Sequence, residues 1–208
     1  MSSTRGRLLA GAISLVSATA WAQGGQPDSV VYVLSPASRF DVKTGKAGLL
    51  GFAGHTHVVR ASGFAGRVVY YPDAPSESHV DIVVPADSLA VLGPSDTAEV
   101  RKITQAMRAD VLHVNEYPVI NFVSASVTPS GEGFHVQGRL TLVGQTRDVS
   151  CDIHAEIARD TLRASGSFSV RQTDFGIRPY RGGPAGTVRV ADRVTFSFDA
   201  VGIRSPEP

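Results

Sequence analysis

The chain has almost no cysteine and no charge bias, and it lacks the common catalytic motifs. One cysteine among 208 residues leaves no possibility of an intrachain disulfide. The 20 basic and 19 acidic residues nearly cancel, and a neutral chain offers no electrostatic footprint for nucleic acid. It contains no Gly-x-Ser-x-Gly, no phosphate loop and no dinucleotide fingerprint, and its acidic residues form no obvious pair. We therefore expect a protein that is not an enzyme and has no nucleic-acid partner.

Long apolar runs are also missing, apart from a short one near the N-terminus. Two arginines precede the apolar run Leu8–Ala20, which is too short to span a bilayer. Ala20-Trp21-Ala22 then fits the small-x-small pattern of a cleavage site. These features predict a signal peptide over residues 1–22, a single domain over 23–208, and a periplasmic or secreted location. The leader carries two Arg and no acid, so the remaining 186 residues have a formal charge of −1.

Apolar and polar side chains alternate through most of the remaining chain, most clearly from Phe134 to Ile157. A period of two means a strand with one dry face and one wet face. Gly144 divides two such runs and supplies the backbone freedom that a tight turn needs. This stretch predicts a long antiparallel hairpin with about ten residues in each arm, longer than a common strand. Hairpins of this length favour a barrel or a strongly curved sheet.

Helical spacing is clear only once. Asp96 is expected to cap a helix over Thr97–Ala109, with Val100, Ile103 and Met107 on one apolar stripe. This helix would cover a spot on a sheet or close one end of a barrel. Together with further alternating runs before and after it, the pattern predicts an all-β, antiparallel barrel of about eight strands with one short α-helix.

The apolar faces of the predicted strands are the best candidates for a binding surface. The residues that we expect to point inward are Phe40, Phe64, Val68, Tyr70, Ile82, Phe122, Leu140, Leu142, Phe168, Phe196 and Phe198. Cys151 has the same parity on its strand and is expected to be a buried, inert thiol. Glycines interrupt these faces at Gly66, Gly138 and Gly166, which predicts either strand curvature or space left for a ligand.

One polar pattern stands out, the sequence Gly54-His55-Thr56-His57. Positions two apart on a strand point the same way, so His55 and His57 could contact one ligand or one metal ion. A structural zinc site needs about four ligands, and the sequence near this pair offers two. We expect the two imidazoles to lie at a cavity mouth and to contact a ligand head group, with a metal or haem site as the alternative.

Three motifs, taken in order, resemble the YceI-like family of secreted bacterial proteins, which are described as polyisoprenoid-binding. These are Tyr117-Pro118-x-Ile120-x-Phe122-x-Ser124, then Gly138-x-Leu140-Thr141-x-x-Gly144-x-Thr146-x-x-Val149, then Thr173-Asp174-Phe175-Gly176-Ile177. The resemblance covers most of the chain after the leader. Two positions depart from the family pattern: Tyr32-Val33-Leu34-Ser35 lacks the usual Asp, and Ala109-Asp110-Val111-Leu112 replaces an Arg-Asp pair.

The resemblance implies a lipocalin-like barrel whose elongated apolar pore holds an isoprenoid-tailed lipid or a quinone. It implies transport, storage or sensing of that ligand, with no other cofactor and with transient contact to a membrane or membrane protein. The inward residues and the two histidines would then form the ligand site. The alternative function is that of a metal- or haem-associated redox accessory protein that uses His55 and His57. The sequence does not specify an oligomeric state.

Overall fold

The structure is a computed structural model that describes residues 28–46, 57–93, 97–182 and 188–206. The predicted leader and His55 lie outside these residues. The first strands are β1 (Val30–Leu34), β2 (Arg39–Lys46), β3 (Val58–Ala61), β4 (Ala65–Tyr70), β5 (His79–Pro85) and β6 (Leu89–Leu92). The later strands are β7 (Val119–Ser130), β8 (Gly133–Leu142), β9 (Gln145–Ile157), β10 (Thr161–Arg171), β11 (Arg181–Gly182) and β12 (Val188–Arg204). The helical segments are α1 (Ala98–Ala106), η1 (Pro75–Glu77), η2 (Ala86–Ser88), η3 (Met107–Val111) and η4 (Gln172–Phe175).

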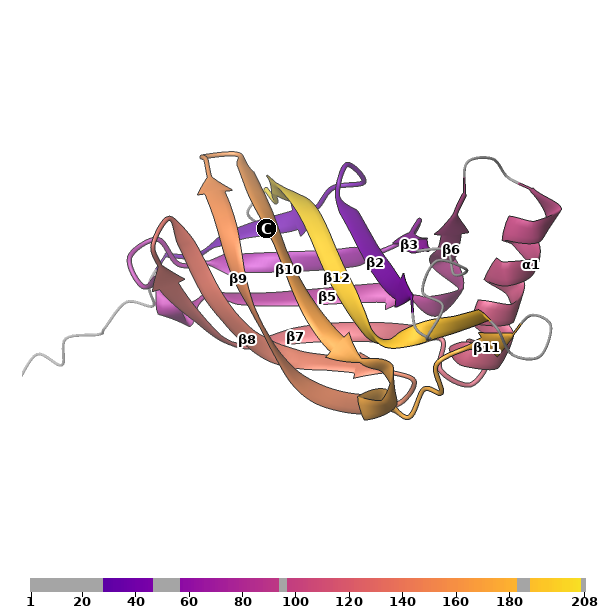
Figure 1. Cartoon of the computed structure of the whole chain (residues 1–208). Coiled ribbons are helices and arrows are strands. Elements are labelled where there is room, and N and C mark those ends of the chain that lie inside the picture. Colours follow the sequence, from indigo (N-terminus) through magenta and orange to yellow (C-terminus); the bar gives the residue numbers. More distant parts are fainter. Residues whose placement is uncertain (1–27, 47–56, 94–96, 183–187, 207–208) are drawn as a thin grey trace, which may run out of the picture.

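Eight strands form a closed antiparallel ring in the order β1-β4-β5-β7-β8-β9-β10-β12 (Figure 1). The ring closes because the C-terminal part of β12 pairs with β1, with Val33 opposite Ile203. The predicted all-β barrel with one short α-helix is therefore confirmed. Closure pairs each strand of the ring with a neighbour on both sides over at least part of its length, which is how small barrels protect their backbone groups.

The three N-terminal strands are each broken into two segments. β1 leads into β2, β3 into β4, and β5 into β6, and the segments β2, β3 and β6 extend the sheet from β12. The first break is held by Ser38, whose hydroxyl accepts a hydrogen bond from the amide of Val201 at 2.9 Å. The extension carries the sheet toward one end of the barrel, beside the helix (Figure 1).

The predicted long hairpin is present as β8 and β9, which pair from Gly133 opposite His154 to Leu142 opposite Gln145. Its two-residue turn places Val143 at φ 48° and Gly144 at φ 68°. Positive φ at both central residues is the type I′ turn that matches the twist of a hairpin. A Cβ at Gly144 would also lie 2.6 Å from the ring of Tyr117, so close packing as well as conformation favours glycine there.

The α-helix of the described residues begins at Ala98, one residue after the predicted start, and its cap and its end also differ from the prediction. Thr97 caps the helix, because its hydroxyl accepts a hydrogen bond from the amide of Val100. Asp96, the expected cap, lies outside the described residues. After Ala106 the helix widens into the turn η3, which ends at Val111 rather than at Ala109.

The helix satisfies backbone groups on the outer edge of β6. The amide of Val91 donates to the hydroxyl of Thr104 at 3.1 Å, and Nε of Arg108 donates to the carbonyl of Leu89 at 2.8 Å. A strand edge with no neighbouring strand would otherwise expose such groups. The helix therefore does more than cover an apolar spot, since it completes the hydrogen bonding of the sheet extension.

Buried side chains at both ends of the barrel join segments that are far apart in the sequence. At the helix end, Phe175 is 1 % exposed and packs with Ile177 and Leu112 in the main apolar core. The short helical turn η4 lies there, anchored where Asp192 accepts hydrogen bonds from the amide and hydroxyl of Thr173. At the opposite end, the hydroxyl of Tyr32 donates to the carbonyl of Ala158 at 2.9 Å.

Candidate functional site

The barrel encloses a cavity of about 290 Å³ whose walls are almost entirely apolar. Side chains from all eight strands of the ring reach it, as do residues of β2, β3 and β6. Met107, Val111 and Leu112 close it at the helix end, together with Ile177. Its volume lies at the lower end of the range for small-molecule sites.

Ten of the eleven predicted inward residues line this cavity. They are Phe40, Val68, Tyr70, Ile82, Phe122, Leu140, Leu142, Phe168, Phe196 and Phe198. Phe64 was expected on the same strand face as Val68, but β4 begins at Ala65 and Phe64 lies in the bend before it. Its ring packs edge-on against Phe40 with centroids 4.9 Å apart, so it does not itself line the cavity.

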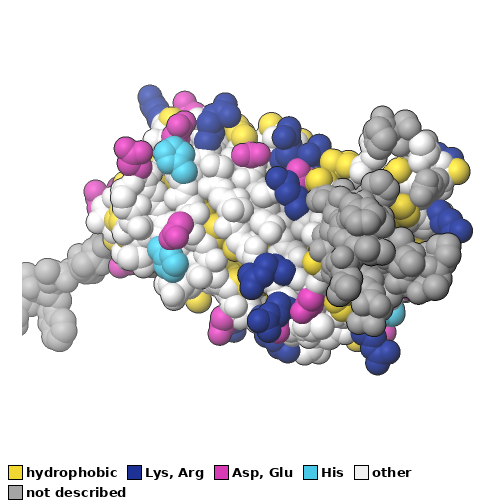
Figure 2. All heavy atoms as spheres, in the orientation of Figure 1, with side chains coloured by type: hydrophobic (Ala, Val, Ile, Leu, Met, Phe, Trp, Pro, Cys, Tyr) yellow, Lys and Arg dark blue, Asp and Glu magenta, His cyan; other side chains and the backbone are white. Residues whose placement is uncertain are grey.

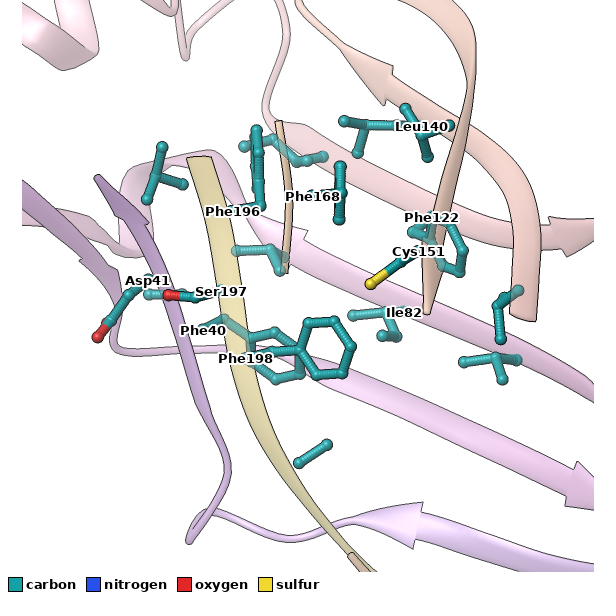
Figure 3. A pocket seen from close by; sticks show the side chains of 18 of the residues that line it. Phe40, Asp41, Ile82, Phe122, Leu140, Cys151, Phe168, Phe196, Ser197 and Phe198 are labelled. Carbon is teal, nitrogen blue, oxygen red and sulfur yellow. The ribbon is translucent and has the colours of Figure 1, made fainter. Parts of the chain in front are cut away.

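Two pairs of aromatic rings shape the middle of the cavity (Figure 3). Phe168 and Phe196 are stacked, with centroids 5.1 Å apart and planes 3° from parallel. Phe40 and Phe198 form a looser stack at 6.4 Å. Stacked phenylalanine rings are rigid and apolar, so they offer a flat surface for a hydrocarbon chain and contain no polar group that needs a hydrogen-bond partner.

Two of the three inward glycines leave room for aromatic rings rather than for a ligand. A Cβ at Gly138 would lie 2.5 Å from the ring of Phe122, and one at Gly166 would lie 2.9 Å from the ring of Phe198. Phe198 therefore lies over the glycine directly opposite it on the neighbouring strand, and Phe122 lies over the glycine diagonally across from it. Aromatic rings therefore fill the space at Gly138 and Gly166 and lie near the wall, whereas at Gly66 the side chain of Leu34 and the carbonyl of Asp81 come closest.

Cys151 lines the cavity, as its strand parity indicated, and its side chain is partly buried. The thiol donates to the carbonyl of Ser167 at 3.3 Å. Burial raises the pKa of the Cys151 thiol, and the bond to Ser167 opposes this only in part. The thiol is therefore protonated at neutral pH, which fits the expected inert role.

The charged groups of Asp41 and Arg60 beside the cavity neutralise each other in an ion pair. Nε and an NH₂ group of Arg60 both donate to the carboxylate of Asp41, each at 2.7 Å. This fork holds the pKa of Asp41 below its usual value. Figure 3 shows the Asp41 carboxylate directed away from the aromatic rings, so the pair does not place a charge in the lumen.

The predicted histidine pair is only partly visible. His55 lies outside the described residues. His57 lies directly before β3, where its amide donates to the hydroxyl of Thr44 and its carbonyl accepts from the amide of Thr44. Thr44 lines the cavity and His57 does not. In the part of the chain that the structure describes, no group of three or more His, Cys, Asp or Glu side chains is close enough to hold a metal ion.

Several lining residues were not predicted. Val149 and Ile153 share the parity of Cys151 and could have been found from it. Val127 could not, because a bulge between Ser124 and Ser126 reverses the inward parity of β7. Leu112 and Ile177 lie in segments with no strand period at all.

A closed eight-stranded antiparallel barrel around an apolar cavity defines the class of lipocalin-like barrel proteins. The model of the YceI-like domain matches residues 34–202 of this chain. The chain therefore belongs to the YceI-like family, and the resemblance drawn from its motifs is confirmed.

Solved structures agree on the fold. The chain is similar to BcnA of Burkholderia cenocepacia, with a TM-score of 0.64 and 19% identity over 81% of this chain and 98% of that one. It is also similar to a YCEI protein of Campylobacter jejuni, with a TM-score of 0.56 and 15% identity over 72% and 85% of the two chains. A search of curated proteins found no match. No helix in the described ranges is both long and apolar enough to cross a bilayer.

Proposed function

We propose that this protein binds an isoprenoid-tailed lipid or quinone, with the tail in the barrel cavity, and serves its transport, storage or sensing. The observation that carries the proposal is the apolar cavity lined from every strand of the ring. The binding role of the lining residues, and of His55 and His57 toward a head group, is part of the proposal. So are the absence of another cofactor and the absence of catalysis.

The length of the cavity supports a tail of several isoprene units. Val149 and Ile157 both line it and lie eight residues apart on β9. At about 3.3 Å per residue and a tilt of about 40°, this span covers on the order of 20 Å along the barrel axis. Four chain bonds per isoprene unit give roughly 5 Å when extended, so about four units fit.

The energy of burial favours such a ligand. Each isoprene unit has five carbons and gains about 3–4 kcal/mol gross at about 0.8 kcal/mol per methylene. Two or three buried units offset the cost of immobilising a ligand, which is commonly about 4–15 kcal/mol. No charged anchor is needed for this balance.

A matched pair of variants tests the proposal. Ala164→Phe places a ring inside the cavity, while Arg163→Phe places the same ring on the exposed outer face of the same strand. We expect delipidated wild-type protein and Arg163→Phe to bind radiolabelled geranylgeraniol at one molecule per barrel. Ala164→Phe should bind much less while remaining folded by circular dichroism. Equal binding by both variants would contradict a site in the lumen.

The expected location and the rival function are tested separately. If the leader is removed as proposed, N-terminal sequencing of exported protein should begin at Gln23. Metal analysis of the purified protein should find no stoichiometric zinc, copper or haem. A stoichiometric metal that disappears in the His55→Ala/His57→Ala variant would favour the redox accessory role instead.

A further inference from the structure

The hydrogen-bonded ladder between β9 and β10 stops partway along the two strands. They pair from Leu162 opposite Ile157 to Gly166 opposite Ile153. Beyond that point residues 145–152 of β9 pair with β8, residues 167–171 of β10 pair with β12, and no pairing joins these two described segments. The two strands diverge along their length from the turn that joins them (Figure 1). We call the gap between these two segments the lateral slot.

The lateral slot is a groove of about 540 Å³ that meets the apolar cavity. Val149, Ser150, Cys151 and Phe168 line both the slot and the cavity. The Cys151 thiol reaches across the opening to the carbonyl of Ser167 on β10. The floor of the slot therefore has no backbone ladder to break, and the weak bond from the Cys151 thiol to Ser167 crosses it instead.

The rim of the slot is polar and carries charges of both signs. Its basic residues are Arg147 and Arg193, and its acidic residues are Asp148, Asp152 and Asp174. His135 also lies there, and its Nδ1 is 2.6 Å from a carboxylate oxygen of Asp152. Charged side chains of both signs are interspersed over this side of the molecule rather than separated into patches (Figure 2).

This rim suits an uncharged polar group better than an anion. Two arginines face three carboxylates, so a diphosphate would meet as much repulsion as attraction. Hydroxyls of Ser150, Ser167 and Ser169 and the strand edges that face the slot instead supply donors and acceptors. An alcohol or a quinone carbonyl can use these groups without a counter-ion.

We propose that the ligand enters and leaves through the lateral slot, and that its neutral, hydrogen-bonding head group stays there while the tail passes Cys151 and Phe168 into the cavity. This inference rests on the proposed function, because it assigns the route and the head-group class for the same ligand. It replaces His55 and His57 as the head-group contacts, since the residues that line the slot do not include His57.

Two tryptophan variants on one strand test the route. Ser150 and His154 are both exposed on the outer face of β9, but Ser150 borders the slot and His154 lies where the ladder to β10 is closed. We expect Ser150→Trp to slow the association of geranylgeraniol about tenfold or more, and His154→Trp to stay within about twofold of wild type. Wild type should also bind geranylgeraniol about tenfold or more tighter than geranylgeranyl diphosphate.

Cys151 offers a second test if Ser150→Trp does not fold. It is the only cysteine in the chain, so an excess of N-ethylmaleimide, applied at alkaline pH because burial raises the pKa of this thiol, places one bulky group on the slot floor. Alkylated wild type should take up geranylgeraniol more slowly, whereas Cys151→Ser treated with the reagent should be unchanged.

The outcomes separate this inference from the proposed function. If wild type binds geranylgeraniol but blocking the slot leaves the association rate unchanged, the slot is not the route and the cavity proposal stands. Tighter binding of the diphosphate overturns the neutral head group. If wild type binds neither compound, both the inference and the proposed function fail.

Discussion

Replacing Gly138 by alanine tests the packing that keeps the aromatic rings near the cavity wall. The new Cβ would lie 2.5 Å from the ring of Phe122 and 2.7 Å from the carbonyl oxygen of Val123. The ring can turn, but the carbonyl belongs to the β7–β8 ladder and cannot move without disturbing it. We expect a loss of about 1–3 kcal/mol, the usual cost of overpacking.

Gly166→Ala is the matched control, because its Cβ would meet side chains only, with Phe198 at 2.9 Å and Cys151 at 3.0 Å. Side chains can shift, and removing a glycine from the unfolded chain recovers about 0.4–1 kcal/mol. Gly166→Ala should therefore unfold within about 1 kcal/mol of wild type, yet hold less ligand because Phe198 is pushed into the lumen.

Urea unfolding followed by circular dichroism measures the difference. For a domain of this size, each kcal/mol also corresponds to about 2–4 °C in Tm. The double variant Gly138→Ala/Phe122→Leu should recover part of the loss, because the shorter side chain removes the ring contact. A Gly138→Ala protein as stable as wild type would refute the close packing described here.

Three further predictions concern the helix, the ion pair and the cavity wall. Thr104→Val should cost about 1–3 kcal/mol in urea unfolding, because the buried amide of Val91 loses its acceptor; Thr104→Ser should be much milder, and equal effects would contradict this role. Arg60 lowers the folded-state pKa of Asp41, so its stabilisation is complete above the unfolded pKa near 4 and is lost as pH falls below it. Wild type should thus lose more stability than Asp41→Asn between pH 7 and pH 3, and parallel losses would remove this pair as a cause. Leu140→Asp buries an unpaired carboxyl at a site 3 % exposed and should abolish ligand binding or unfold the barrel, whereas Arg139→Asp on the exposed face should do neither; unchanged binding and melting in Leu140→Asp would count against the inward assignment.

The regular strands could be predicted from the sequence, and the breaks in them could not. Before and after the turn at Gly144 the strand residues alternate between the lumen and water, and the hairpin follows from these two runs. Phe64 was misplaced because the chain bends between β3 and β4, and the inward parity changes from Val59 to Val68 across that bend. The alternation of apolar and polar residues does not reveal such a bend.

The ends and the side of the barrel were beyond sequence reasoning for another reason. Phe175, Ile177 and Leu112 close the cavity from irregular segments, whose inward residues depend on long-range contacts rather than on spacing. The lateral slot depends on where the pairing of β9 with β10 stops. Both strands continue their alternation past that point, so the pattern predicts a ladder that the fold does not form.

Mass spectrometry of lipids extracted from the protein, purified without detergent from the cells that naturally make it, tests the central claim most directly. We predict one dominant prenyl-chain species of about four or more units per barrel in wild type and Arg163→Phe, carrying a neutral head group, and its loss in Ala164→Phe. An extract without any prenyl lipid, or the same lipid at full occupancy in Ala164→Phe, would contradict an isoprenoid-binding cavity.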